Sequence, residues 1–170
     1  MRKGILIVIE GIDGSGKTRV AKEIIRRIEK IGLKALYTHE PYTSKFSKAL
    51  KELPKEYIEP ELEALALAAD RYVHVKEVIE PALRNGIVVI SDRYHYSSIA
   101  YQGAKGVDIE WIKELNRWVP KPDIAIYLDV EPEEGLRRRA KEISEWPEFE
   151  KLTIVEKARN IYLDLVKEGE

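Results

Sequence analysis

Cysteine is absent from this sequence of 170 residues. Without thiols the chain forms no disulfide bond and no cysteine-ligated metal site. A basic excess is missing as well, because 29 Lys and Arg residues face 30 Asp and Glu residues and leave a net charge of -1. Proteins whose main role is to bind nucleic acid usually carry a basic excess. We therefore expect no nucleic-acid partner.

Long hydrophobic runs are also missing. The first apolar run, residues 5–9, is too short to span a bilayer, and no other run is longer. A signal peptide would not lead directly into the glycine-rich loop that follows this run. We expect no membrane partner and a cytoplasmic location. The length fits one α/β domain over residues 1–170.

The most informative motif is a glycine-rich octet near the start of the chain. It extends from Gly11 to Thr18 and fits the phosphate-binding pattern of glycine, four residues, glycine, lysine and serine or threonine. An apolar run over residues 5–9 precedes the octet, and a helical pattern over residues 19–31 follows it, which is the context that such a loop requires. The octet therefore predicts binding of a nucleoside triphosphate together with Mg²⁺.

The residue types of the octet suit a triphosphate. Glycines let several backbone N–H groups approach the phosphate oxygens together, and the N-terminus of the following helix adds partial positive charge. Lys17 is expected to reach the β- and γ-phosphates, and the hydroxyl of Thr18 is expected to ligate Mg²⁺. The loop residues assigned to the nucleotide are Gly11, Asp13, Gly14, Ser15, Gly16, Lys17 and Thr18.

Strand and helix patterns alternate along the rest of the chain. We predict strands over 5–9, 35–38, 87–91 and 124–128, and helices over 19–31, 61–84, 109–118, 133–143 and 152–166. Pro81 is expected to kink or break the second helix. This alternation predicts an α/β fold of the P-loop NTPase type, with a parallel sheet and helices on both faces. Ligands of such sheets lie beyond the carboxyl ends of the strands.

An acidic and a basic residue stand side by side where the third predicted strand ends. Asp92 is placed where a Walker B-like carboxylate holds Mg²⁺ or its waters. Arg93 presents a planar fork of donors that suits phosphate oxygens. The plainer interpretation is a surface ion pair. A simple hydrolase has no evident need for the arginine, so the two residues favour a kinase whose acceptor carries a phosphate.

Taken in order, the motifs resemble the thymidylate kinase family, whose members transfer the γ-phosphoryl group of ATP to dTMP. The resemblance covers essentially the whole chain. It is carried by residues 7–18, His39-Glu40-Pro41, Ala68-Ala69-Asp70-Arg71, Asp92-Arg93-Tyr94 and residues 97–103. It implies ATP and dTMP as bound nucleotides, Mg²⁺ as cofactor and a homodimer.

The resemblance also implies an acceptor site. Asp13 would face the sugar 3′-hydroxyl and the acceptor phosphate, which Arg93 would hold. Arg71 and Gln102 would reach the base, and Tyr101 would pack near C2′. A pairing of Arg71 with Glu77 or with another acidic residue of a helix is the alternative for that arginine. The full implied set is Asp13, Glu40, Pro41, Leu67, Arg71, Arg93, Ser97, Ser98, Tyr101 and Gln102.

A basic stretch is expected to act on the triphosphate from a lid at about residues 135–150. In the family a basic residue near the triphosphate comes either from the phosphate loop or from the lid. Because Gly14 follows Asp13 here, the lid must supply it. Arg137 is assigned to the nucleotide, and Arg138 joins Lys17, Asp13 and Arg93 in the implied catalytic set, with the lid arginine stabilising charge on the γ-phosphoryl oxygens. A solvated basic helix face is the plainer interpretation.

The sequence departs from the family pattern in three places. Leu67 stands where the family usually has a phenylalanine that stacks on thymine. Arg138 is followed four residues later by Glu142 rather than by a second arginine. The sequence ends at Glu170, before the family's fifth strand, so we expect four strands. These departures leave two alternatives open. One is a kinase with relaxed or different base choice, which would accept dUMP or a nucleoside. The other is a nucleotide-binding protein without kinase activity.

Overall fold

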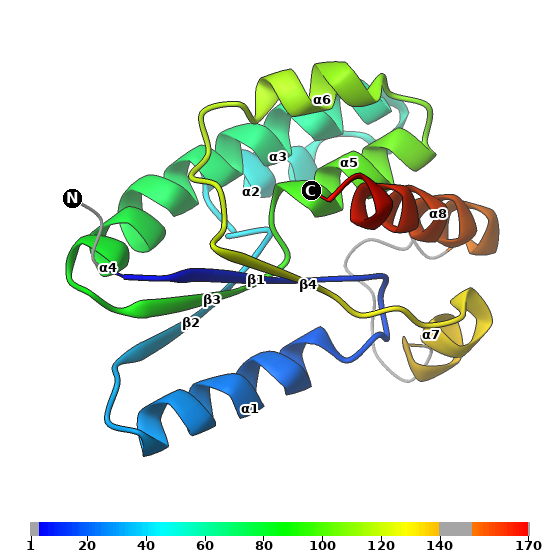
Figure 1. Ribbon diagram of the computed structural model, residues 1–170. Helices are drawn as coiled ribbons and strands as arrows, with labels where there is room; N and C mark the ends of the chain where they lie inside the picture. Colours follow the sequence, from blue (N-terminus) through cyan, green and yellow to red (C-terminus); the bar gives the residue numbers. More distant parts are fainter. Residues whose placement is uncertain (1–3, 140–150, 170) are drawn as a thin grey trace.

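The computed structural model describes residues 4–139 and 151–169 (Figure 1). Within these ranges four parallel strands form one sheet in the order β2-β3-β1-β4. The strands are β1 (Leu6–Glu10), β2 (Ala35–His39), β3 (Val88–Asp92) and β4 (Ile124–Tyr127). The predicted α/β fold is confirmed, and every strand lies within one residue of its predicted bounds.

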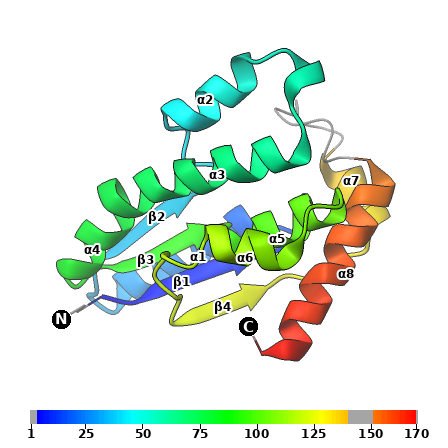
Figure 2. The same ribbon diagram turned by 90° about the horizontal axis from the view of Figure 1, so that it is seen from above.

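Helices cover both faces of the sheet (Figures 1 and 2). One face carries α1 (Lys17–Lys30), which contacts β1, β2 and β3. The other helices are α2 (Lys45–Glu52), α3 (Pro60–His74), α4 (Glu80–Arg84), α5 (His95–Ala104), α6 (Ile109–Leu115), α7 (Pro132–Arg139) and α8 (Leu152–Glu168). The opposite face is covered by α3 to α5, with α6 packed on α3 and α5, and with α8 beside α5. No helix within the described ranges is both long and apolar enough to cross a bilayer.

The central strand β1 is buried on both sides because its alternate side chains enter different clusters. Leu6 and Val8 pack with Val75 and Ile79 of the α3–α4 layer. On the other side, Ile9 packs in a cluster with α1. A strand covered on both faces appears in the sequence as a continuous apolar run, which is why the pattern at residues 5–9 predicted it well.

The predicted helix over residues 61–84 is interrupted, as Pro81 suggested, but earlier than expected. Helix α3 ends at His74, and a π-helical turn over Val75–Ile79 leads into α4. Proline has no N–H, and its ring clashes with the carbonyl of the residue four positions earlier in a regular helix. The wider turn before Pro81 accommodates both effects. The helix predicted over 109–118 ends at Leu115, and that predicted over 133–143 is described only through Arg139.

Neither α2 nor α5 was predicted from the pattern. Helix α5 buries most of its residues, including Ser98, Ile99, Ala100 and Gln102, so polar and apolar side chains are buried together. A helix buried around most of its circumference shows no amphipathic stripe. This helix nevertheless carries several of the predicted site residues.

Asp70 of α3 fixes the chain between β2 and α2. Its buried carboxylate accepts hydrogen bonds from the backbone N–H of Tyr42 at 2.6 Å and of Ser44 at 2.7 Å, and from the hydroxyl of Ser47 at 2.8 Å. The Asp70 side chain therefore accepts hydrogen bonds from three donors in a segment that lies outside the sheet.

We expect Asp70→Ala to lower the free energy of unfolding by about 2–4 kcal/mol, because it leaves buried donors without an acceptor. Asp70→Asn, which keeps one acceptor oxygen, should lose less. The measurement is urea denaturation followed by circular dichroism. Asp164→Ala is the matched control, since its exposed pair with Lys167 should contribute less than about 0.5 kcal/mol. Equal stability of the Asp70 and Asp164 variants would contradict this account.

Candidate active site

The glycine-rich loop connects the end of β1 to the start of α1. Gly14 has a φ of 77°, and a Cβ there would lie 2.1 Å from the carbonyl oxygen of Gly135 in α7, so this position accepts glycine alone. The hydroxyl of Ser15 is buried and has no hydrogen-bond partner among the described residues. A buried unpaired hydroxyl in a loop of this type suits the oxygen of a bound phosphate.

Lys17 begins α1 and is only 7% exposed. Its ammonium group donates a hydrogen bond to the backbone carbonyl of Ile12 at 2.9 Å, across the loop. Burial, together with the nearby positive charge of Arg93, lowers the pKa of Lys17 to about 8. The ammonium group of Lys17 is thus held inside the loop, where an incoming anion would stabilise its protonated form.

Thr18 and Asp92 meet at the carboxyl end of the sheet. The Thr18 hydroxyl donates to Asp92 Oδ2 at 2.5 Å, and the Tyr37 hydroxyl donates to the same oxygen at 3.2 Å. Asp92 is opposite Ile9 in the β1–β3 register, which brings the end of β3 to the phosphate-binding loop. Mg²⁺ prefers oxygen ligands and is usually held by one or two side chains together with substrate phosphates. The hydroxyl of Thr18 and the carboxylate of Asp92 fit that requirement.

Arg93 connects the loop to α5. Its Nη2 donates to Asp13 Oδ1 at 2.7 Å, and its Nη1 donates to the Gly11 carbonyl at 3.2 Å and to Ser97 Oγ at 2.9 Å. The guanidinium carbon lies 5.2 Å from the centre of the Tyr101 ring, and the Tyr101 hydroxyl accepts a bond from the Asp13 N–H at 3.1 Å. Burial opposes ionisation of Asp13, but Arg93 and Lys17 hold its pKa below the usual value.

A buried carboxylate lies behind Arg93. Glu10, the last residue of β1, accepts hydrogen bonds from the Tyr94 N–H at 2.7 Å, from Ser97 Oγ at 2.6 Å and from the Tyr162 hydroxyl at 2.9 Å. Burial raises the pKa of Glu10 despite these donors. Tyr162 belongs to α8, so the last helix contributes a hydrogen bond to the carboxylate that lies behind Arg93. The sequence pattern assigned no role to Glu10 or Tyr162.

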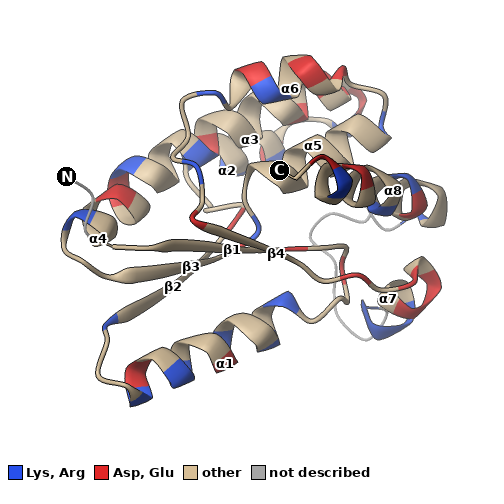
Figure 3. Ribbon diagram, in the orientation of Figure 1, with Lys and Arg blue, Asp and Glu red and all other residues tan. Residues whose placement is uncertain are grey.

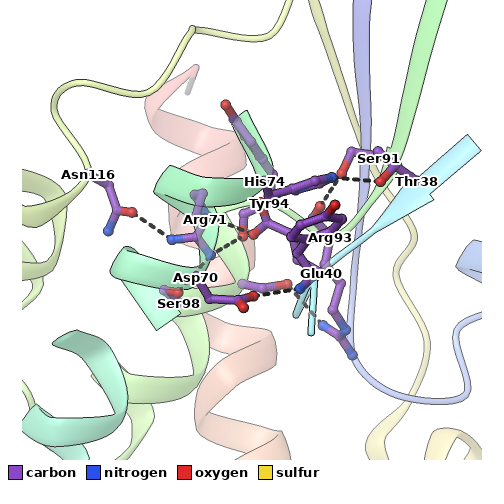
Figure 4. A network of polar contacts seen from close by, with 12 residues as sticks. Thr38, Glu40, Asp70, Arg71, His74, Ser91, Arg93, Tyr94, Ser98 and Asn116 are labelled. Carbon is purple, nitrogen blue, oxygen red and sulfur yellow. Dashed lines mark hydrogen bonds and ion pairs between the residues drawn. The ribbon is translucent and has the colours of Figure 1, made fainter. Parts of the chain in front are cut away.

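Arg71 of α3 is held at the centre of a second polar network (Figure 4). It is 3% exposed and donates to Glu40 Oε2 at 2.7 Å, to Asn116 Oδ1 at 2.6 Å and to Ser98 Oγ at 3.0 Å. The alternative pairing of Arg71 with Glu77 is wrong, because its ion pair is formed with Glu40. Asn116, which directly follows α6, was missed, since no local pattern connects it to an arginine of α3.

Glu40 has a second partner in α3. His74 Nδ1 lies 3.0 Å from Glu40 Oε1, and His74 Nε2 lies 2.6 Å from the Thr38 hydroxyl. Both carboxylate oxygens of Glu40 are therefore engaged below the surface of the pocket. The end of β2 is tied to α3 by these contacts.

One pocket gathers every residue predicted to bind the acceptor. Its lining is Asp13, Glu40, Pro41, Leu67, Asp70, Arg71, Arg93, Tyr94, Ser97, Ser98, Tyr101, Gln102 and Arg139. An adjoining hollow is lined by loop residues, among them Gly14, Gly16, Lys17 and Thr18, together with Asp92. The two share Asp13, Glu40, Arg93 and Arg139. The predicted nucleotide loop and the predicted acceptor residues thus open onto neighbouring spaces.

Basic residues occupy part of α7, as the blue segment of that helix in Figure 3 shows. These arginines differ in how they contact the loop hollow. Arg137 is exposed and bonds Glu134 at 2.7 and 2.8 Å. Arg138 bonds Glu134 at 2.7 Å and the Gly14 carbonyl at 3.3 Å, and it lines the hollow. Arg139, which was not in the predicted site set, lines both spaces. The rest of the predicted lid, residues 140–150 with Glu142, lies outside the described residues.

Comparison with known proteins gives the family. The model of the thymidylate kinase family matches residues 9–170. The chain belongs to this family. A probable thymidylate kinase of Staphylothermus marinus is 46% identical over 166 residues, which cover 98% of this chain and 83% of that protein. A probable thymidylate kinase of Pyrococcus abyssi is 44% identical, with 97% and 84% covered, and one of Archaeoglobus fulgidus is 44% identical, with 94% and 81% covered. The predicted family and its kinase class are confirmed.

The lowered pKa of Lys17 makes triphosphate binding depend on pH. Above about pH 8 the free enzyme loses the Lys17 proton, and bound phosphates should restore it because they raise the pKa again. We expect ATP binding to weaken as the pH rises through about 8 and to take up close to one proton at pH 9. Calorimetry in two buffers of different ionisation enthalpy measures this uptake. Lys17→Arg, which stays protonated, should take up none, and equal uptake by both proteins would exclude Lys17 as the source.

Proposed function

We propose that this chain transfers the γ-phosphoryl group of ATP to the phosphate of dTMP, giving dTDP and ADP, with Mg²⁺ as cofactor. The observation that carries the proposal is the adjacency of the loop hollow and the acceptor pocket, with Arg93 and Asp13 in both linings. Phosphoryl transfer needs a donor and an acceptor anion held in line and close together. Membership of the thymidylate kinase family selects the nucleotides.

The donor end is assigned to the glycine-rich loop. Its N–H groups, the hydroxyl of Ser15 and the ammonium of Lys17 bind the β- and γ-phosphates. Thr18 and Asp92 would hold Mg²⁺, which would supply positive charge to the phosphate oxygens. Arg138, which already contacts the loop at Gly14, supports the same oxygens from α7.

The acceptor end is assigned to Arg93 and its neighbours. The guanidinium of Arg93 binds the dTMP phosphate, one oxygen of which attacks the γ-phosphorus while the bond to the bridging oxygen of ADP breaks. No general base is required, because the acceptor oxygen is already anionic and positioning dominates the barrier. Tyr101 packs against the sugar, and Arg71 and Gln102 face the base edge.

A second candidate function has the same phosphoryl transfer from ATP but a different choice of acceptor base. It is favoured by Leu67, which lines the acceptor pocket where the family usually has a phenylalanine. Leucine packs on a base without the ring–ring contribution, which is worth about 1 kcal/mol. A kinase acting on dUMP or on several monophosphates is the specific alternative. A cytoplasmic location and the absence of a nucleic-acid partner stay predictions.

The decisive experiment is a coupled ADP-release assay with ATP and Mg²⁺ against dTMP, dUMP, dCMP, dGMP, UMP and thymidine. We expect strong preference for dTMP. Comparable turnover of several monophosphates would support the kinase activity and contradict the assignment of dTMP as the preferred acceptor. No turnover with any acceptor would overturn the kinase itself.

In the same assay, Arg93→Ala should lower kcat/KM for dTMP by about a hundredfold or more, because two charge-assisted bonds to the phosphate are lost. The KM for dTMP should rise. Arg26→Ala, on the exposed face of α1, should leave both parameters unchanged. An unchanged KM for dTMP in the Arg93 variant would show that the acceptor phosphate is bound elsewhere.

The homodimer also stays a proposal, supported by apolar side chains that α3 leaves at the surface. Leu65 is 47% exposed and Tyr72 is 50% exposed, and their spacing puts them on one face of the helix. We expect light scattering after size exclusion to give twice the chain mass of 19.6 kDa, and Leu65→Glu to give the mass of one chain. A wild-type protein that stays monomeric at micromolar concentration would rule the dimer out.

A further inference from the structure

One arginine of the last helix binds two carboxylates and lines neither the acceptor pocket nor the loop hollow. Arg159 of α8 donates through Nε and Nη2 to the two oxygens of Asp129 at 2.8 and 2.9 Å. It also donates through Nη1 and Nη2 to the two oxygens of Glu131, both at 2.7 Å. Isolated surface ion pairs contribute little, but bidentate pairs joined in a network fix the relative geometry of their partners.

The two carboxylates belong to the connection between β4 and α7. Glu131 directly precedes α7, which begins at Pro132, and the Glu131 carbonyl accepts the N–H of Gly135 at 3.0 Å in the first helical turn. Arg159 therefore binds the residue from which α7 starts. Helices α7 and α8 pack against each other, as Figures 1 and 2 show. The direction in which α7 leaves the sheet is thus tied to α8.

The placement of α7 matters because this helix meets the glycine-rich loop backbone to backbone. A Cβ on Gly14 would lie 2.1 Å from the carbonyl oxygen of Gly135. The same approach lets Arg138 Nη1 donate to the Gly14 carbonyl at 3.3 Å. A group that stabilises a transition state loses much of its effect when it is displaced by about 1 Å. The anchor of α7 therefore bears on what Arg138 can do.

Helix α8 provides a fixed base for this anchor. Tyr162 lies three residues after Arg159, so the two side chains are neighbours on the helix. The Tyr162 hydroxyl donates to Glu10 at 2.9 Å, and its ring stacks on that of Tyr127 in β4 with the centroids 5.1 Å apart. Tyr162 is 2% exposed. The segment of α8 that carries Arg159 is thus held against β1 and β4.

We propose that Arg159 positions Arg138 for phosphoryl transfer by binding Asp129 and Glu131 at the base of α7. The inference rests on the proposed function, since it assigns the anchor of an arginine that acts on the triphosphate. Arg159 is a positioning residue, because its guanidinium is engaged by the two carboxylates and lines neither nucleotide space. Its loss should affect the transfer step and leave the acceptor pocket unchanged.

Charge compensation is a second effect that the test must separate from positioning. Residues 129–134 include four acidic side chains, and Arg159 offsets two of them close to a site for polyphosphate. A lysine has the same charge as an arginine but lacks the planar fork that binds two carboxylates at once. Arg159→Lys therefore retains the compensation and loses most of the geometry.

The first measurement is steady-state kinetics with ATP, Mg²⁺ and dTMP. Arg159→Met keeps a long side chain and a good helix former, and it should lower kcat by about tenfold while the KM for dTMP changes by less than about twofold. Arg159→Lys should stay about threefold below the wild type, because its charge remains without the fork. Lys167→Ala, an exposed position near the end of α8, should match the wild type.

A double-mutant cycle tests whether Arg159 acts through Arg138. In the Arg138→Ala background, Arg159→Met should lower kcat by less than about twofold more, since the group that it positions is gone. Glu131→Gln keeps the test decisive if Arg159→Met folds poorly, because Glu131 lies outside α8 and its side chain is 68% exposed. We expect this variant to lower kcat by about threefold, since Arg159 retains its bonds to Asp129.

Hydrogen exchange gives a readout that does not depend on catalysis. In Arg159→Met the backbone amides of residues 135–138 should exchange about tenfold faster than in the wild type, because the start of α7 is no longer held. The amides of β1 and β3 should exchange at unchanged rates. Faster exchange throughout the protein would show a general loss of stability and would contradict a local role of Arg159.

Three further results would overturn the inference. One is an unchanged kcat in a folded Arg159→Met protein. Another is full activity of Arg159→Lys, which would show that charge compensation alone is needed. The third is additive losses in the cycle with Arg138→Ala. A wild type without phosphoryl transfer would instead refute the proposed function, and the exchange of α7 amides would then still decide whether Arg159 holds this helix.

Discussion

The ion pair between Arg93 and Asp13 is the contact on which both halves of the site depend. Asp13 belongs to the glycine-rich loop after β1, and Arg93 follows β3, so the neighbouring position of these two strands in the sheet brings the residues together. Arg93 has a φ of 72°, and its carbonyl accepts a bond from the Ser91 hydroxyl at 2.7 Å. Loss of either charge would leave the other partly buried without its partner. The sheet order therefore sets the distance between the loop hollow and the pocket lined by the predicted acceptor residues.

Buried carboxylates hold the arginines of the site in fixed orientations. Glu40 takes the Nε–H of Arg71 on one oxygen and contacts His74 with the other. Glu10 acts on Arg93 indirectly, since it accepts the hydroxyl hydrogen bond of Ser97, which itself receives Nη1 of Arg93. Groups fixed in this way lose little freedom when an anion binds, which is the basis of electrostatic preorganisation. Under the proposed function, these acidic residues therefore contribute to anion binding because they position the arginines that donate to the anion.

Local patterns in the sequence were sufficient for part of this arrangement. The octet at residues 11–18, the apolar strands and the Asp92–Arg93 pair each lie within a few consecutive residues. The sequence therefore predicted the sheet and the edge at which the candidate site is proposed. Asn116 and Tyr162 contact residues of other elements, and nothing in the sequence next to them indicates those contacts. Helix α5 escaped prediction for a related reason, since burial of its polar residues removes the stripe that a pattern search needs. Long-range polar contacts were therefore the part that required the structure.

The overall charge of -1 conceals a local concentration of positive charge. Helix α7 can approach the loop closely because Gly14 and Gly135 have no side chains, and a Cβ on Gly135 would lie 2.6 Å from the Asp13 carbonyl. This approach brings Arg138 and Arg139 to a hollow that Lys17 and Arg93 already line. Three acidic residues, Asp13, Glu40 and Asp92, also line the hollow and offset only part of that charge. The low dielectric of a partly buried site strengthens what remains. A polyphosphate is attracted to such a site whatever the charge of the whole chain, because the field at short range depends on the nearest groups.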